Sequence, residues 1–121
     1  IEEAAALMFE KRIGALPVVQ GDRLVGIITE ADVLGVLAEM MGATKTASRL
    51  EIEIPASPGV LTDVIRTLEG QQAEIASLVT LPAREGARRL LIMRLRTINP
   101  DPVVSALAER GYPQVVSEFV R

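Results

Sequence analysis

Thr29 and Asp32 are the two side chains whose types and spacing best suit ligand chemistry. They end the segment Gly26-Ile27-Ile28-Thr29-Glu30-Ala31-Asp32, in which an apolar run opens directly into a helical pattern. Thr29 stands where a helix N-cap is expected, so a hydroxyl, a carboxylate and free backbone amides gather at one strand-to-helix corner. A helix N-terminus can receive phosphate, and a carboxylate can accept hydrogen bonds from sugar hydroxyls. The corner can therefore hold a ligand that carries both a phosphate group and a sugar.

The same two residues also fit a purely structural interpretation. Thr-x-x-Asp is close to a capping box, in which the two side chains satisfy the first amides of the helix and do nothing else. Spacing alone favours this interpretation. The surrounding pattern shifts the balance toward a ligand site. It consists of a helix ending near Lys11 or Arg12, the stretch 13–19, a turn at Gly21-Asp22 and a strand in which Leu24, Val25, Ile27 and Ile28 are expected to be buried.

This succession resembles the second half of a CBS domain. The resemblance implies that the Gly-x-x-Thr-x-x-Asp signature contacts an adenosine ligand, with Thr29 facing the phosphate and Asp32 the ribose hydroxyls. Gly26 would let the ligand and the backbone approach closely. The residues implied to line the adenine are Gly14, Ala15, Leu16 and Pro17. AMP, ATP and S-adenosylmethionine are the regulatory ligands that the resemblance suggests. Because the chain begins inside a helical pattern without a methionine, we also expect a missing N-terminal portion that includes the first strand of this unit.

Composition excludes several classes of function. The chain has 121 residues, 49% of them apolar, which suffices for a hydrophobic core. Its charges are scattered and sum to −3, which argues against nucleic-acid and membrane-surface binding. Without cysteine, histidine or tryptophan, it lacks the usual metal ligands, thiol nucleophile and general base, so we expect neither an enzyme nor a metal site. No apolar run is long enough to cross a membrane, and the first residues show no basic region followed by a signal-like apolar segment, which predicts a cytoplasmic protein.

A domain boundary is predicted just after the second helical pattern. That helix carries a broad apolar stripe of Val33, Leu34, Leu37, Met40 and Met41. We favour core packing for its methionine-rich end, with a helix-on-helix dimer surface as the alternative. Gly42 is expected to end the helix. We therefore assign residues 1–43 to the CBS-like part, 44–47 to a linker and 48–121 to a second domain.

The second domain is predicted to be a ferredoxin-like α+β sandwich, with elements in the order strand, helix, strand, strand, helix, strand. Leu50, Ile52 and Ile54 alternate with charged residues, which indicates a half-buried strand in a sheet with one wet face. Ser57 is the expected N-cap of the next helix, with Pro58 at its first position. The remaining elements are expected at Ile75–Leu81, Leu90–Thr97, a helix from Asn99-Pro100-Asp101-Pro102 to Gly111, and Val115–Val120.

This order makes the first and third strands neighbours, which has a consequence for the charged residues. Glu51 and Glu53 would lie near Arg94 and Arg96 on the open face of the sheet. Opposite charges on neighbouring strands favour pairing. We favour such a paired, solvated face over the alternative of an anion-binding patch.

Residues 48–121 resemble an ACT domain, on the segment Ile52-Glu53-Ile54-Pro55-Ala56-Ser57-Pro58-Gly59-Val60-Leu61 and the order of elements around it. The resemblance implies dimers and a small-ligand site at Ser57, Pro58 and Gly59. Two departures weigh against an amino-acid ligand: Ala56 stands where Asp is common, and Glu74 where Asn often precedes the isoleucine. We favour the interpretation of Ser57–Gly59 as a capped helix start.

Together the two parts resemble CBS-ACT regulatory proteins of the acetoin-utilisation type. The implied function is a non-catalytic sensor of an adenosine-containing ligand that forms a homodimer or higher oligomer and acts on an unknown protein partner. Two alternatives stay open: an amino-acid-responsive regulatory region of a metabolic enzyme, and a purely structural oligomerisation module.

Overall fold

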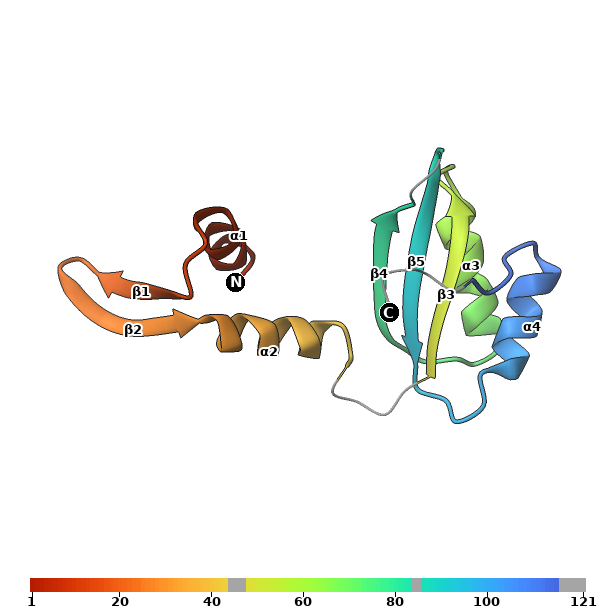
Figure 1. Cartoon of the computed structure of the whole chain (residues 1–121). Coiled ribbons are helices and arrows are strands. Elements are labelled where there is room, and N and C mark those ends of the chain that lie inside the picture. The colour runs from red at the N-terminus through yellow and green to blue at the C-terminus, as the bar shows by residue number, and fades with distance from the viewer. Residues whose placement is uncertain (44–47, 84–85, 116–121) are drawn as a thin grey trace. The chain divides into compact units, whose positions relative to one another are not determined.

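Two separate antiparallel sheets organise the computed structural model, which is α+β as predicted (Figure 1). The structure describes residues 1–43, 48–83 and 86–115. The chain divides into two units, Ile1–Thr44 and Lys45–Arg121, and each is considered by itself below. The predicted linker at 44–47 lies outside the described residues.

The first unit places a two-stranded hairpin between two helices. Its elements are α1 (Glu2–Lys11), β1 (Ala15–Gln20), β2 (Arg23–Thr29) and α2 (Glu30–Met40). Helix α1 ends where predicted, because Arg12 adopts a left-handed conformation with φ 53°. The predicted turn lies between β1 and β2, with Gly21 at φ 60°. Gly42, at φ 71°, follows the C-cap of α2 as expected.

The hairpin is much more exposed than its sequence suggested. Leu24, Val25 and Ile27 have 57%, 52% and 60% of their surface exposed, so the prediction of a buried strand is wrong for this chain. The reason is that the sheet of this unit has only two strands. The buried apolar residues of the unit, among those described, are Met8 and Val33.

The methionine-rich end of α2 also differs from the preferred interpretation. Met40 and Met41 are 55% and 45% exposed, and Leu34 on the same helix is 65% exposed. Core packing within this chain is therefore wrong for these residues. The apolar stripe of α2 is wider than the surface that packs against the rest of the unit. Only Val33 of this helix is buried, and the other apolar side chains of the stripe stay at least partly exposed.

The second unit is built on a three-stranded sheet in the order β3-β5-β4. Its elements are β3 (Ser48–Pro55), α3 (Val60–Gly70), β4 (Ile75–Pro82), β5 (Arg88–Leu95) and α4 (Asp101–Glu109). The first and third strands are thus neighbours, as predicted, with Ile52 opposite Leu91. Most of the predicted final strand lies outside the described residues. Just before it, Gln114 forms an isolated antiparallel bridge with Ile52.

Helices α3 and α4 cover one face of this sheet and enclose the main core (Figure 1). Alternation along β3 and β5 directs every second side chain toward the helices. The core residues are Leu50, Ile52 and Ile54 of β3, Leu91, Met93 and Leu95 of β5, Val64 and Leu68 of α3, and Val103 and Leu107 of α4. These contacts hold the loops and helix ends of the unit in place.

The other face of the sheet is less exposed to solvent than predicted. Leu90 and Ile92 alternate with the core residues of β5, yet they are only 4% and 7% exposed. The register explains part of this burial, since Ile92 lies between Glu51 of β3 and Val79 of β4. A side chain on the central strand is flanked by side chains of both neighbouring strands, which reduces its exposure.

The charged residues of this face form ion pairs that include partners not predicted from the sequence. Glu51 is 2% exposed and pairs with Arg49 of its own strand. Glu53 pairs with Arg88 across the β3–β5 register, at 3.7 Å. Arg96 instead reaches Glu74, at 3.3 Å. Opposite charges across β3 and β5 are therefore confirmed for Glu53 and Arg88. The register pairs Glu51 with Ile92, so Arg94 lies diagonally next to Glu51 on the same face, whereas Arg96 follows the end of β5.

Candidate functional site

The corner between β2 and α2 forms a complete capping box. Thr29 is the N-cap, with φ −104° and ψ 165°, and its Oγ1 accepts a hydrogen bond from the Asp32 amide at 3.2 Å. In return, Asp32 Oδ2 accepts hydrogen bonds from the Thr29 amide at 2.8 Å and from its hydroxyl at 2.9 Å. The structural interpretation of this pair is confirmed. It does not exclude ligand binding, because the box uses only part of the carboxylate.

The capping box leaves one carboxylate oxygen of Asp32 unused, and the residue is exposed. Both bonds from Thr29 go to Oδ2, and Oδ1 accepts no hydrogen bond from the described part of the chain. The Thr29 backbone amide, and then its hydroxyl, lower the pKa of Asp32. The group is therefore ionised at neutral pH and exposed. A fixed carboxylate with a free oxygen can accept hydrogen bonds from ligand hydroxyls.

The structure brings only some of the predicted nucleotide-binding residues to this corner. The hairpin register places Ala15 opposite Thr29, and the Gly14 carbonyl accepts a hydrogen bond from the Glu30 amide at 3.0 Å. Gly14 and Ala15 therefore lie beside the start of α2. Leu16 and Pro17 follow along β1, opposite Ile28 and Ile27, and lead away from the corner.

Gly26 lies still farther along the hairpin, opposite Val18. A Cβ atom added at Gly26 would meet only the Val18 Cβ, at 3.9 Å, which is an ordinary contact. The fold of this unit therefore tolerates a side chain at this position. A requirement for glycine here would have to come from a ligand or from a partner.

A groove next to the corner was not foreseen from the sequence. It has a volume of about 550 Å³ and is lined by Met8, Phe9, Glu10, Arg12 and Glu30. Among these, Glu30 lies between Thr29 and Asp32 in the chain, and Phe9 is 85% exposed. No local motif predicts this groove, because it depends on how the end of α1 packs beside the start of α2.

The order of elements in the first unit and the capping-box corner now allow a comparison with known families. Residues 1–39 match the family model of the CBS domain. The match includes α1, the hairpin and nearly all of α2, and it contains every residue predicted to contact a nucleotide. The Thr29–Asp32 corner therefore lies within the part of the chain that matches the CBS domain, residues 1–39, which we call the CBS unit.

Across the described residues, no helix is long and apolar enough to cross a membrane.

In the second unit, the segment Ser57-Pro58-Gly59 forms a turn rather than the first turn of a helix. The Val60 amide donates to the Ser57 carbonyl at 3.4 Å, and Gly59 has φ 86° and ψ −15°. These values, with proline before the glycine, are typical of a type II turn. Helix α3 begins at Val60 with Gly59 as its N-cap, so the prediction of Ser57 as N-cap and Pro58 as first helical residue is wrong.

We expect Gly59→Ala to lower the free energy of unfolding by about 1–2 kcal/mol, because the left-handed conformation of residue 59 places a Cβ too close to the backbone. Gly70→Ala is the matched control. Gly70 ends α3 without a positive φ, and nothing lies within 4 Å of its added Cβ. This substitution should be neutral or stabilise by about 0.5 kcal/mol. Chemical denaturation of both variants measures the difference, and equal effects would contradict the strain at Gly59.

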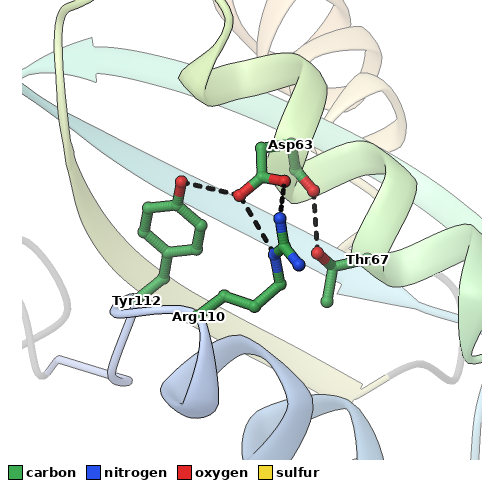
Figure 2. A network of polar contacts seen from close by, with 4 residues as sticks. All are labelled: Asp63, Thr67, Arg110 and Tyr112. Atoms are coloured by element: carbon green, nitrogen blue, oxygen red, sulfur yellow. Dashed lines mark hydrogen bonds and ion pairs between the residues drawn. The ribbon is translucent and has the colours of Figure 1, made fainter.

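A polar network between α3 and the end of α4 was missed by sequence reasoning (Figure 2). Asp63 Oδ2 accepts hydrogen bonds from Arg110 Nε at 3.1 Å and from the Tyr112 hydroxyl at 2.9 Å. Arg110 Nη2 also pairs with Asp63 Oδ1. Nearly fifty residues separate the partners, so only the packing of the two helices makes them meet. An open groove of about 490 Å³ adjoins the network, and Arg66, Gln71 and Glu109 also line it.

The network makes part of the stability depend on pH. Hydrogen bonds from Arg110, and then from Tyr112, lower the pKa of Asp63. Because the pKa is lower in the folded state, this group stabilises the fold above its unfolded pKa of about 3.9, and the contribution is lost as the pH falls through the folded pKa. We expect Asp63→Asn to destabilise the protein at about pH 7 and to lose that effect progressively as the pH falls below about 4 and through the lowered pKa of Asp63. Denaturation curves of both proteins across this range test it, and a pH-independent difference would contradict it.

Proposed function

We propose that this protein is a non-catalytic regulatory sensor whose CBS unit binds an adenosine-containing ligand. The presence of a CBS domain at residues 1–39 indicates a regulatory role. AMP, ATP and S-adenosylmethionine are the candidate ligands, and the proposed setting is a cytoplasmic homodimer or higher oligomer that acts on a protein partner. A ligand shifts such an assembly between states only by its difference in affinity for those states.

The observation that carries the proposal is the arrangement of Asp32. Its carboxylate is held by two hydrogen bonds to Oδ2 at the start of a helix, while Oδ1 takes no part in the capping box and the residue is exposed. Preorganisation of this kind reduces the cost of ordering a side chain when a ligand binds. In this proposal Oδ1 accepts hydrogen bonds from the vicinal hydroxyls of a ribose.

The geometry changes the role proposed for Thr29. Its hydroxyl already donates to Asp32 and accepts from the Asp32 amide. A hydroxyl has one hydrogen to donate, so it cannot donate to a phosphate at the same time. In this proposal Thr29 orients Asp32. The Glu30 and Asp32 amides already donate to Gly14 and Thr29, so the phosphate is received by the Ala31 amide and the positive end of the dipole at the first turn of α2.

The second unit is proposed to be an ACT-like domain that serves oligomerisation or small-ligand sensing, as in CBS-ACT proteins of the acetoin-utilisation type. Its support is the strand order β3-β5-β4 with α3 and α4 on one face, which matches the first five elements of a ferredoxin-like sandwich. The turn at Ser57, Pro58 and Gly59 remains the proposed small-ligand position, although Ala56 provides no carboxylate for an ammonium group. An amino-acid-responsive regulatory region is therefore the less supported alternative.

A specific observation favours one further candidate, a purely structural oligomerisation module. The hairpin of the CBS unit exposes Leu24, Val25 and Ile27 together, each by more than half of its surface. Apolar side chains gathered on one short strand are typical of surfaces that associate. This function would require no ligand at all.

Calorimetric titration of the protein with AMP, ATP and S-adenosylmethionine distinguishes these functions, with GMP as a control for the base. Saturable binding of at least one adenosine ligand in the micromolar range, without comparable binding of GMP, would support the sensor. Absence of binding to all of them at millimolar concentration would contradict it. An oligomeric state that does not change when any of these ligands is added would then favour the structural module.

A further inference from the structure

The chain that leaves α4 is held by two successive contacts with the rest of the second unit. Helix α4 ends in a tight turn, in which the Tyr112 amide donates to the Leu107 carbonyl at 2.9 Å and Gly111 has φ 90°. The side chains on either side of Gly111, those of Arg110 and Tyr112, both reach Asp63 on α3 (Figure 2). The first contact is therefore a three-residue latch, formed by Asp63, Arg110 and Tyr112.

The second contact lies on β3. The Val115 amide donates to the Glu51 carbonyl at 2.8 Å, and Gln114 forms an antiparallel bridge with Ile52. One edge of β3 is paired with β5 along its whole length. Residues 112–115, which we call the strap, therefore cover part of the other edge of β3.

The latch and the contact with the β3 edge are joined by a very short stretch of backbone. Only Pro113 separates Tyr112 from Gln114, and its ring restricts the backbone. One residue extends the chain by about 3.5 Å at most, so fixing Tyr112 on Asp63 also fixes where the strap meets β3. Tyr112 and Gln114 moreover line the same small apolar space, which Leu50, Ile52 and Leu107 close from β3 and α4.

We propose that the Asp63–Arg110–Tyr112 latch keeps the strap on the β3 edge of its own chain, and that opening the latch frees this edge to take the strap of a second copy. This inference does not depend on nucleotide binding. An exposed strand edge offers unpaired backbone groups to any extended chain. A second copy carries the same residues 112–115, which the structure already shows in place on Glu51 and Ile52. Exchange of identical segments is a low-cost route to an oligomer.

The latch is tested by hydrogen exchange of the full chain with the variants Asp63→Ala and Tyr112→Phe. Loss of charge-assisted hydrogen bonds should speed exchange of the Val115 amide by about tenfold or more in Asp63→Ala, and by less in Tyr112→Phe. Amides of β5, such as those of Leu91 and Met93, should keep their protection. Glu109→Gln is the matched control, because Glu109 lines the same groove but has no hydrogen bond to Arg110 or Tyr112.

The partner is tested by measuring molar mass by light scattering over a range of protein concentrations. Asp63→Ala should reach a higher mass than the wild type and Glu109→Gln at equal concentration, and Val115 should regain protection as that mass rises. Unchanged exchange at Val115 would overturn the latch. Faster exchange without any increase in mass would overturn exchange with a second copy and leave the β3 edge open to another extended chain.

Discussion

Asp32→Ala should weaken binding of the adenosine ligand by about 100-fold or more, because a charged acceptor for two ribose hydroxyls is lost and each such hydrogen bond contributes about 1.5–3 kcal/mol. The substitution also removes one half of the capping box, so some loss of stability is expected. Affinity from calorimetry and stability from denaturation must therefore be measured on the same variant. An affinity equal to that of the wild type would contradict the proposed role of Asp32.

A second substitution at the same position separates capping from recognition. Asp32→Glu supplies the residue most typical of the third helical position of a capping box, so the helix start should remain stable. The extra methylene moves the carboxylate, and we expect a loss of affinity of about tenfold or more without a matching loss of stability. Asp22→Ala is the control, since Asp22 is an exposed carboxylate in the hairpin turn. If stability and affinity fall together in every variant, Asp32 acts only as a cap.

The features that could be predicted from the sequence are those governed by neighbouring residues. The capping box at Thr29, the end of α1 near Arg12 and the turn at Gly21 depend on contacts within about four residues, and each is found where predicted. The adjacency of β3 and β5 followed from the order of elements and from the alternation of β3. Local chemistry and chain connectivity sufficed for these features.

Most of what could not be predicted depends on contacts between distant residues or on surfaces that this chain does not cover. The prediction that β2 is buried rested only on its apolar residues. The sheet of this unit has two strands, and Val25 is therefore half exposed. The Asp63 latch needs α3 and α4 to pack before Arg110 can reach its partner. The shift of the α3 start from Pro58 to Val60 has a local cause, since proline followed by glycine forms a type II turn as readily as a helix start. These failures show why the capping box at Thr29 and Asp32 was predicted better than its surroundings.

The two-unit organisation leads to a prediction about the core of the second unit. Leu91 lies on the central strand β5, is fully buried and faces Ile52 on one side and Thr80 on the other. Leu91→Ala should lower the free energy of unfolding of this unit by about 2–5 kcal/mol, because it removes buried methyl groups and leaves a cavity. The CBS unit belongs to the other of the two compact units, so nucleotide affinity is expected to change by less than about twofold.

Tyrosine fluorescence makes this measurement specific. The chain has one tyrosine and no tryptophan, and Tyr112 packs against the core of the second unit. Its emission during denaturation therefore follows the unfolding of that unit alone, whereas calorimetric titration follows the CBS unit. Leu61→Ala is the matched control, because Leu61 on α3 is 38% exposed and its truncation should cost less than about 1 kcal/mol. Similar losses for the two leucines would contradict the core as described. A large fall in nucleotide affinity in Leu91→Ala would instead show that the stability of the second unit is coupled to ligand binding in the first.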